Sequence, residues 1–542
     1  MDQAVNRPSG RSSIGLLAGV LAGCLASLGA LAIAVVANQP SLVEELGDAI
    51  TEVTPIRVVV AMIQTFGPLA KRLLLVAVLL GQIGVGALLG ASFARRGWSW
   101  KRRTGAVIAT LATVGLVALP LFGQGVLGSE TQYGAMRTLG ALAVVGALYL
   151  ICYEGIWAIA TSTGAITSNE PSVRRGYIRT SVIAVGSLAL GFSAFRWLAE
   201  RPGPAIRAAA PQPSAAIMPP VVRAIDAIPE SVEPNSLKIT LDRGVPGLAT
   251  EITPNDELYA VSKNLVRDPA VNSNDWRLTV GGLVERPASY RYDEIRALPA
   301  AQQYFTMQCV GNPIGGDLIG NAQWTGISVA SLLKEAGVKP SAFKVVFHAA
   351  DRYADSILLA KAMEPDTMLA YEMNGAPLPQ QHGFPARLIL PDIYGQKNVK
   401  WVTGIEVVDY DFKGYWEERG WDDTVQMHTT SRIDLPKHGA ALRAGPNFIG
   451  GIAVAGARGI SRVEVSVDGG MTWAPATVKS ALGPSAWILW LYDWDVPQEL
   501  DRAKLVVRAT DGAGTPQIAE VHEDFPEGVT GYHSIEIRRA LA

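Results

Sequence analysis

The sequence predicts a multidomain protein with three kinds of structure: an all-α transmembrane bundle of about five helices, an α+β domain and a β-sandwich. The first 200 of its 542 residues hold long apolar runs, which are typical of membrane spans. The next region mixes short β-like runs with helical segments, and the last hundred residues hold short strands divided by turns. We expect the boundaries 1–200 for the bundle, 201–235 for a linker rich in proline and alanine, 236–430 for the α+β domain and 431–542 for the sandwich.

Five apolar stretches are long enough to cross a bilayer. They lie near Ser13–Ala37, Leu73–Phe93, Thr104–Leu121, Leu139–Ala160 and Ser181–Leu198. Arginine and lysine precede the first span and fill the second and fourth connections, whereas the first connection is acidic. This asymmetry predicts a cytoplasmic amino terminus. An odd number of spans then predicts a multi-pass plasma-membrane protein with its soluble domains outside the cytoplasm.

The polar residues of the bundle limit what it can bind. All six histidines lie beyond residue 340, so the bundle offers no pair of histidines for a haem and we expect none there. Glu154 is the one carboxylate inside a predicted span. Such a group is a functional candidate because it is costly in lipid, and a hydrated place near the membrane surface explains it equally well.

A short basic segment before the fifth span carries a second hypothesis. The run Ser172-Val173-Arg174-Arg175-Gly176-Tyr177-Ile178 resembles a twin-arginine export signal. That route carries proteins that have already folded around a cofactor. Ordinary positive charge on the cytoplasmic side of a span explains the same arginines.

Cys309 is the only cysteine of the soluble region, since Cys24 and Cys152 lie in apolar runs. It therefore has no partner for a disulfide within its own domain. A solitary thiol in an exported domain is explained by a metal bond, by a nucleophilic role or by burial alone.

Local patterns predict the elements of the soluble region. In the α+β domain we expect a strand at Trp276–Val280 followed by a turn at Gly281-Gly282, a helix at Val329–Ala336 ended by Gly337, and buried strands at Lys344–His348 and Arg387–Leu390. In the sandwich we expect strands at Ile452–Val454, Arg462–Val467, Trp487–Leu491 and Leu505–Thr510, with a turn at Asp468-Gly469-Gly470. The spacing of the second set is typical of a sandwich of about a hundred residues.

Five motifs in residues 250–430 resemble the molybdopterin domain of the sulfite oxidase family. They are Cys309-Val310-Gly311-Asn312, Trp324-Thr325-Gly326, Leu369-Ala370-Tyr371-Glu372-Met373-Asn374-Gly375, His382-Gly383-Phe384-Pro385-Ala386-Arg387 and Val399-Lys400-Trp401. Downstream, Val465-Ser466-Val467-Asp468-Gly469-Gly470, with Trp473 close behind, resembles that family's immunoglobulin-like dimerisation domain. The resemblance covers about residues 250–535 and does not include the bundle. It implies a homodimer.

The resemblance implies a molybdenum–molybdopterin cofactor and residues that hold it. Cys309 matches the thiolate ligand of the metal, which suits the soft ligation that molybdenum takes beside a pterin dithiolene. The residues that match cofactor-binding positions are His382, Arg387, Lys397 and Lys400; a guanidinium can hold the cofactor's phosphate through paired hydrogen bonds. The alternatives are an ion pair with Asp392 for Arg387, loop stabilisation for His382 and solvated surface charge for Lys397.

The substrate side departs from the family pattern. Lys263 matches an arginine of sulfite oxidases and Asn264 matches an asparagine, and both are expected beside the cofactor. Trp421 aligns with a tyrosine next to the metal, yet it offers only one indole N–H. A further family arginine aligns with Ile314 or Pro313, so the positive charge that suits a sulfite dianion is reduced.

These features favour a membrane-anchored, extracytoplasmic oxidoreductase that moves an oxygen atom on a small substrate, most simply by reducing an S- or N-oxide. The catalytic residues we expect are Cys309, Lys263 and Trp421. The alternatives are oxidation of sulfite or a similar oxyanion, and a non-catalytic molybdopterin-domain scaffold. Membrane lipid and a quinone or redox protein are the expected partners, and a net charge of −2 shows no footprint for nucleic acid.

Overall fold

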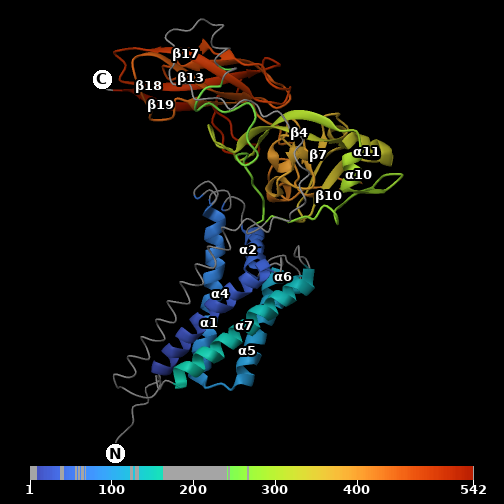
Figure 1. The fold of residues 1–542 in the computed structure, drawn as a ribbon, viewed down its shortest axis with the longest axis vertical. Helices are drawn as coiled ribbons and strands as arrows, with labels where there is room; N and C mark the ends of the chain where they lie inside the picture. The colour runs from blue at the N-terminus through green and yellow to red at the C-terminus, as the bar shows by residue number, and fades with distance from the viewer. Residues whose placement is uncertain are drawn as a thin grey trace, which may run out of the picture. The chain divides into compact units, whose positions relative to one another are not determined.

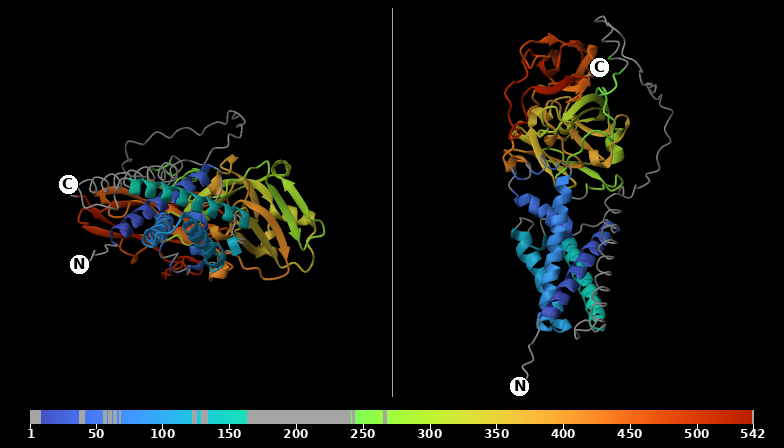
Figure 2. Two further views of the ribbon diagram at one scale, coloured as in Figure 1. Left: turned by 90° about the horizontal axis from the view of Figure 1, so that it is seen from below. Right: turned by 90° about the vertical axis from the view of Figure 1, so that its left-hand side faces the viewer.

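The computed structural model describes residues 9–36, 42–54, 58, 62, 66, 69–121, 126–128, 134–162, 241, 244–264 and 268–540. The chain forms two compact units, an amino-terminal helical unit and a carboxy-terminal unit that holds all described strands. Figures 1 and 2 draw the first in blue to cyan and the second in green to red. The predicted fifth span, the linker 201–235 and the twin-arginine segment lie outside the described residues.

Four helices of the amino-terminal unit are long and apolar enough to cross a membrane. They are α1 (Ser9–Val36), α4 (Leu69–Arg96), the run formed by α5 (Trp100–Thr113), a π-helical turn (Val114–Ala118) and α6 (Leu119–Leu121), and α7 (Gly134–Ser162). These agree with the first four predicted spans. The acidic first connection also forms a short helix, α2 (Leu42–Val53), which the sequence analysis did not predict.

Glycines allow α1 and α4 to pack backbone against backbone. A Cβ added to Gly86 would lie 3.0 Å from Gly19 O, and one added to Gly90 would lie 2.6 Å from Gly19 Cα. Small residues at this spacing are a common device for close helix association in membranes. Tyr149 and Tyr153 of α7 donate hydrogen bonds to Gly86 O and Gly90 O at 2.6 and 3.2 Å. The interface therefore joins three helices.

Glu154 has a partner in the bundle. Arg103 Nη1 lies 2.9 Å from both carboxylate oxygens of Glu154. The Arg103 guanidinium also lies over the rings of Tyr153 and Trp157, at 5.7 and 5.8 Å from their centroids. Arg103 lies in the first turn of α5, and the Glu154 side chain is 42% exposed. An ion pair with Arg103 thus accompanies this carboxylate.

Two sheets form the α+β part of the carboxy-terminal unit. One has the order β2-β1-β10-β5-β6, and the other has the order β3-β4-β7-β8 with β9 paired to β7. The β1–β10 pair is parallel, and the other pairs are antiparallel. The elements are β1 (Arg277–Gly282), β2 (Ala288–Arg291), α10 (Tyr292–Ala297), β3 (Ala301–Gln308), β4 (Ile319–Ser328), α11 (Val329–Ala336), β5 (Lys344–Ala349), β6 (Ala354–Leu358), α12 (Leu359–Ala362), β7 (Met368–Met373), β8 (Ala376–Pro377), β9 (Arg387–Ile389) and β10 (Val402–Val408).

A β-sandwich follows in the same unit. Its sheets have the orders β11-β13-β17-β16 and β12-β19-β18-β14-β15, and both contribute to one core that includes Trp490 and Leu505. The elements are β11 (Thr430–Leu435), β12 (Ala441–Leu442), β13 (Gly445–Val454), β14 (Ile460–Ser466), β15 (Ala474–Pro475), β16 (Thr477–Val478), β17 (Ile488–Val496), β18 (Arg502–Asp511) and β19 (His533–Arg539). The two-sheet sandwich is confirmed; its immunoglobulin-like character stays a prediction.

Most predicted elements are present, with one error of interpretation. The helix Val329–Ala336 is α11, and Gly337 ends it with φ 72°. The turn predicted at Gly281-Gly282 is wrong, because both glycines belong to β1 and pair with Glu406 and Val407 of β10. Gly282 lies against the backbone of Val407, and a Cβ at Gly282 would be 2.2 Å from Val407 O. The glycine therefore allows β1 and β10 to approach closely at this position.

Replacing Gly90 by alanine tests the helix interface. We expect Gly90→Ala to lower the thermal unfolding midpoint of the full-length protein in detergent, because overpacking of this kind costs roughly 1–3 kcal/mol. Gly84→Ala in the same helix is the matched control, since nothing lies within 4 Å of a Cβ at Gly84. Equal midpoints for the two variants would contradict the close α1–α4 packing.

Candidate molybdopterin site

Cys309 follows β3 directly and begins a tight loop. Its backbone N–H donates to Leu318 O at 2.9 Å, and Asn312 N–H donates to Cys309 O at 3.0 Å. The Asn312 side chain closes the loop by accepting from Leu318 N–H at 2.9 Å. Burial raises the pKa of the Cys309 thiol to about 11. A bound metal reverses that preference, because a coordinating thiol is deprotonated.

Two tyrosines surround the Cys309 loop. A Cβ on Gly395 would lie 2.5 Å from the hydroxyl of Tyr259 and 3.3 Å from Gln308 O. Because Gly395 has no side chain, the Tyr259 hydroxyl can lie close to the end of β3, next to Cys309. Burial raises the pKa of Tyr259 well above its usual value, and charge on Cys309 raises it further. Tyr394 is buried, and its hydroxyl accepts from His428 N–H at 3.2 Å.

The sandwich region also contributes to this loop. A Cβ on Gly311 would lie 3.1 Å from Asp524 Oδ2. Burial is the largest cause of the raised pKa of Cys309, and the charge on Asp524 is a smaller cause in the same direction. The candidate site is therefore built by both halves of the carboxy-terminal unit.

Arg387 is a buried cation with no carboxylate partner in the part of the chain that the structure describes. It is 3% exposed and donates to His382 O at 3.0 Å, Asn398 O at 3.2 Å and Met307 Sδ at 3.1 Å. Its Nε has no acceptor among those residues. Burial lowers its pKa to about 10, so the guanidinium remains charged at neutral pH. A buried charge without a counterion is costly, and the arrangement suits an anion.

The alternative explanation for Arg387 fails on geometry. Asp392, the carboxylate considered as its partner, lies 2.6 Å from Nη1 of Arg458 instead. The Arg387 guanidinium carbon lies 5.1 Å from the centroid of the Trp324 ring. Carbonyls, a thioether and an aromatic face therefore hold this cation in place without neutralising it.

His382 and Lys400 converge on Arg387. His382 Nε2 lies 2.8 Å from Asn255 O and donates to it, and burial lowers the pKa of His382 to about 4. Lys400 donates to Gln381 O at 3.0 Å. Gly383, with φ 111°, lies between the three: a Cβ there would be 3.0 Å from Arg387 Cβ and 3.1 Å from Lys400 Cβ. The structure thus brings these three predicted cofactor residues together.

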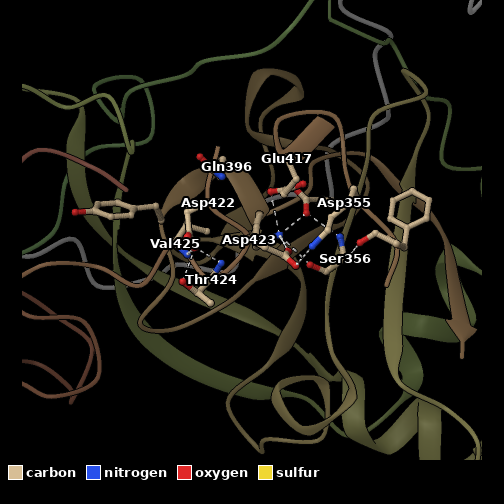
Figure 3. Close-up of polar contacts among 12 residues, drawn as sticks. Asp355, Ser356, Gln396, Glu417, Asp422, Asp423, Thr424 and Val425 are labelled. Atoms are coloured by element: carbon tan, nitrogen blue, oxygen red, sulfur yellow. Dashed lines mark hydrogen bonds and ion pairs between the residues drawn. The ribbon is translucent and has the colours of Figure 1, made fainter. Parts of the chain in front are cut away.

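Lys397 lies elsewhere, in a cluster of carboxylates. Its Nζ lies 2.8 Å from Asp355 Oδ1, 3.0 Å from Asp423 Oδ1 and 3.1 Å from Glu417 Oε1. The acidic side chains point toward one another in Figure 3. Lys397 is 1% exposed, so the alternative of solvated surface charge is wrong. Burial opposes its charge, but Asp355 and Glu417 raise its pKa above the usual value.

The predicted substrate-side residues form no single contact group. Lys263 Nζ lies 5.9 Å from the ring centroid of Tyr415. Asn264 is buried, and its role as a cofactor residue stays a prediction. Trp421 is 7% exposed, its ring centroid lies 5.4 Å from that of Phe525, and its Nε1–H has no acceptor among the described residues.

Sequence reasoning missed several residues of the site. Tyr259 stands four residues before Lys263 in a segment already singled out, so its hydroxyl could have been considered. Tyr394 and Asp524 carry no sequence signal, because only folding brings them to the Cys309 loop. Asp355 and Glu417 were missed for the same reason.

The residues present fit a molybdopterin cofactor. Within the described residues no group of three or more His, Cys, Asp or Glu side chains could hold a metal ion, so a site that takes one protein thiolate and draws its other sulfur ligands from a dithiolene suits this donor set. The uncompensated guanidinium of Arg387 supplies the cation that an anionic cofactor needs. Cys309 would hold the metal, and Arg387, His382 and Lys400 would hold the pterin and its phosphate.

Two family models match the carboxy-terminal unit. The family described as "Oxidoreductase molybdopterin binding domain" matches residues 266–416, and the "Mo-co oxidoreductase dimerisation domain" matches residues 422–538. The chain is 32% identical to mitochondrial sulfite oxidase of Drosophila melanogaster, over 53% of this chain and 59% of that protein. It is 31% identical to sulfite oxidase of Gallus gallus, over 48% and 67% respectively, and 29% identical to sulfite oxidase of Arabidopsis thaliana, over 54% and 89%.

The chain belongs to the sulfite oxidase family. The aligned region spans about six tenths of the fly and mouse enzymes. The apolar helices before residue 163 lie outside both matched domains.

Arg387→Lys tests the anion site. The lysine keeps the positive charge but loses the planar pair of donors, so loss of one charge-assisted hydrogen bond of about 1.5 kcal/mol should lower the cofactor content about tenfold. Molybdenum and pterin analysis of the purified protein measures it. Arg458→Lys is the control, because Arg458 pairs with Asp392 and Asp511 and should affect stability alone. Wild-type cofactor content in Arg387→Lys would contradict the assignment.

The depressed pKa of His382 predicts a pH effect on stability. Its usual pKa is 6.5 and burial lowers it to about 4, so between these values the unfolded chain binds more protons than the folded one. Stability should therefore rise with pH across this window and be lost as pH falls through it, by up to roughly 3 kcal/mol. Thermal midpoints at pH 4 to 7 measure this, and His382→Gln should show a shallower dependence. An identical profile in both proteins would refute a buried neutral His382.

Proposed function

We propose that this chain is a membrane-anchored, extracytoplasmic enzyme that reduces an S- or N-oxide. The reaction is R₂SO + 2 e⁻ + 2 H⁺ → R₂S + H₂O for a sulfoxide. When bound, the molybdenum cofactor supplies the two-electron oxygen-atom chemistry, and the protein supplies position and electrostatics. Cys309 holds the metal, and Arg387, His382 and Lys400 hold the pterin.

The observation that carries the direction of the reaction is the buried, unpaired N–H of Trp421. By its alignment in the sequence, Trp421 takes the place of a tyrosine of sulfite oxidases, and its ring centroid lies 5.4 Å from that of Phe525. A single neutral donor suits the polar oxygen of a neutral oxide, whereas a sulfite dianion calls for several cationic donors. Ile314 or Pro313, which aligns with a family arginine, lowers the positive charge further, and Lys263 supplies a point charge instead of a guanidinium fork.

Sulfite oxidation is the second candidate function. The relatives reported above are all named sulfite oxidases, and that is the observation in its favour. A non-catalytic scaffold is disfavoured by the retained Cys309 thiol and by the uncompensated charge of Arg387, since a domain without cofactor gains nothing from a buried unpaired cation.

The surroundings of the enzyme are part of the proposal. The four apolar helices anchor it in the plasma membrane, and the positions of the arginines and the fifth predicted span place the soluble unit outside the cytoplasm. A quinone or a redox protein supplies electrons. The sandwich, matched by a dimerisation domain, joins two copies.

An anaerobic titration separates the two directions. Dithionite-reduced holoenzyme should be reoxidised by methionine sulfoxide, with return of the thiolate-to-molybdenum absorption band, and the oxidised enzyme should ignore sulfite. Bleaching of that band by sulfite with a transient Mo(V) signal would establish sulfite oxidation instead. If the holoenzyme responds to dithionite but to neither methionine sulfoxide nor sulfite, neither compound is a substrate and the sulfoxide reaction proposed here is wrong.

Trp421→Phe tests the role of the indole N–H. Removing one hydrogen bond to the substrate oxygen, worth about 1 kcal/mol, should lower kcat/KM for the sulfoxide about fivefold and leave cofactor content unchanged. Trp416→Phe, in the same aromatic group at 6.4 Å, is the matched control and should keep wild-type kinetics. Wild-type kcat/KM in Trp421→Phe would contradict the proposed contact.

A further inference from the structure

The carboxylate cluster around Lys397 contains more hydrogen-bond acceptors than hydrogens. Lys397 Nζ has three N–H groups, and it donates hydrogen bonds to Asp355 Oδ1, Ser356 O and Asp423 Oδ1 at 2.8, 3.0 and 3.0 Å. Glu417 Oε1 lies 3.1 Å from the same nitrogen, but neither oxygen of Glu417 accepts a hydrogen bond from a described residue. A buried carboxylate without a donor is costly when ionised.

The same shortage recurs at Tyr353. Its hydroxyl lies 2.8 Å from Asp355 Oδ2 and 2.8 Å from Gln396 O. Both are acceptors when Asp355 is ionised, and a phenol has one hydrogen. One additional proton in the cluster would supply the missing donor: a protonated Asp355 could donate to Tyr353, which would then donate to Gln396 O.

The charges of the cluster lead to the same count. The side chains of Lys344 and Lys397 are 3% and 1% exposed, and those of Asp355 and Glu417 are 1% and 2% exposed. With Asp423, two buried lysines face three carboxylates, so one proton makes the group neutral. The more exposed Asp411 lies 2.7 Å from Lys344 Nζ and 2.8 Å from Lys413 Nζ, and Lys413 Nζ lies 3.0 Å from Asp423 Oδ2. Including Asp411 and Lys413 adds one negative and one positive charge, so the excess of one negative charge remains. Burial first, and Asp355 second, raise the pKa of Glu417 to about 7, although Lys397 opposes them.

Several elements present titratable or charged groups to this cluster. They are Asp351 and Tyr353 just before β6, Asp355 in β6, Lys344 in β5, Lys397 in η4, Asp411 and Lys413 after β10, Glu417 and Arg419 in η5, and Asp423 after η5. Here η4 (Gly395–Lys397) and η5 (Glu417–Arg419) are single 3₁₀ turns.

The two 3₁₀ turns connect the cluster to the candidate site. Gly395 begins η4 against the hydroxyl of Tyr259 and Gln308 O, and Lys397 ends the same turn inside the cluster. Glu417 begins η5, and Trp421 follows this turn by two residues. A change of charge in the cluster therefore acts, at short range and in a buried setting, on the segments that line the cofactor and substrate sides.

We propose that Glu417 and Asp355 share one proton, and that gain or loss of this proton couples pH to the charge and reduction potential of the cofactor site. Glu417 is a positioning residue in this account, since it acts through η4 and η5. The inference rests on the cofactor site and is independent of the proposed substrate and direction.

The test follows the carboxyl group and the metal separately in the full-length holoenzyme. Infrared spectra of the wild type should show a protonated carboxyl band that disappears as pH rises through about 7, and the Mo(VI)/Mo(V) midpoint potential should change slope in the same pH range. Glu417→Gln, which mimics the protonated group, should lose both features. Glu418→Gln, at the exposed neighbouring residue, is the control and should keep them.

Two results would overturn the proposal. The first is a wild type without a titrating carboxyl band between pH 5 and 9, which needs no variant to fold. The second is a Glu417→Gln protein whose potential follows pH as the wild type does. A substrate assay that failed while these signals appeared would refute the proposed function and leave the shared proton standing.

Discussion

The buried and unneutralised charge of Arg387 is the constraint on which the rest of the site depends. Taking an ion out of water costs several kcal/mol even after the protein relaxes. The fold holds this guanidinium with the carbonyls of His382 and Asn398, the sulfur of Met307 and the face of Trp324. None of these carries a negative charge. The surrounding chain thus positions a cation for an anion that the protein itself does not provide.

Several local features follow from this charge. His382 is kept neutral by burial and by the nearby guanidinium, so it adds no further positive charge and can donate to Asn255 O. Gly383 must lack a side chain because Arg387 and Lys400 close over it. Asn398 orients its carbonyl toward Arg387 while its side chain accepts from Leu390 N–H at 2.7 Å. The segment before β9, at His382, and the segment after it, at Asn398, are therefore both held by hydrogen bonds from Arg387.

Lys397 shows the opposite solution to the same problem, ten residues away. Its ammonium is as deeply buried as Arg387 but is surrounded by carboxylates. The first cation is left open for a ligand, whereas the second is closed by the protein and fixes η4. The loop of Cys309, the turn η4 and the segment of strand β9 are each anchored by their own polar contacts.

Patterns local in sequence predicted local structure well, and contacts distant in sequence escaped them. The helix Val329–Ala336 and its glycine end follow from apolar spacing and a left-handed cap, and four spans follow from hydropathy. Gly281-Gly282 was read as a turn because glycine pairs often form turns, yet close packing on β10 fixes it in a strand. Lys397 could not be placed, because its partners Asp355 and Glu417 are 42 and 20 residues away and carry no motif. Asp524 could not be predicted at the Cys309 loop for the same reason, because it lies far away in sequence, beyond the molybdopterin domain.

X-ray absorption at the molybdenum edge of the purified full-length protein tests the central claim most directly. The claim is that Cys309 and an anionic pterin held by Arg387 form one metal centre. The account predicts molybdenum with a sulfur shell that loses one thiolate in Cys309→Ser and is unchanged in Cys152→Ser. Protein without molybdenum, or an identical sulfur shell in Cys309→Ser and the wild type, would contradict it.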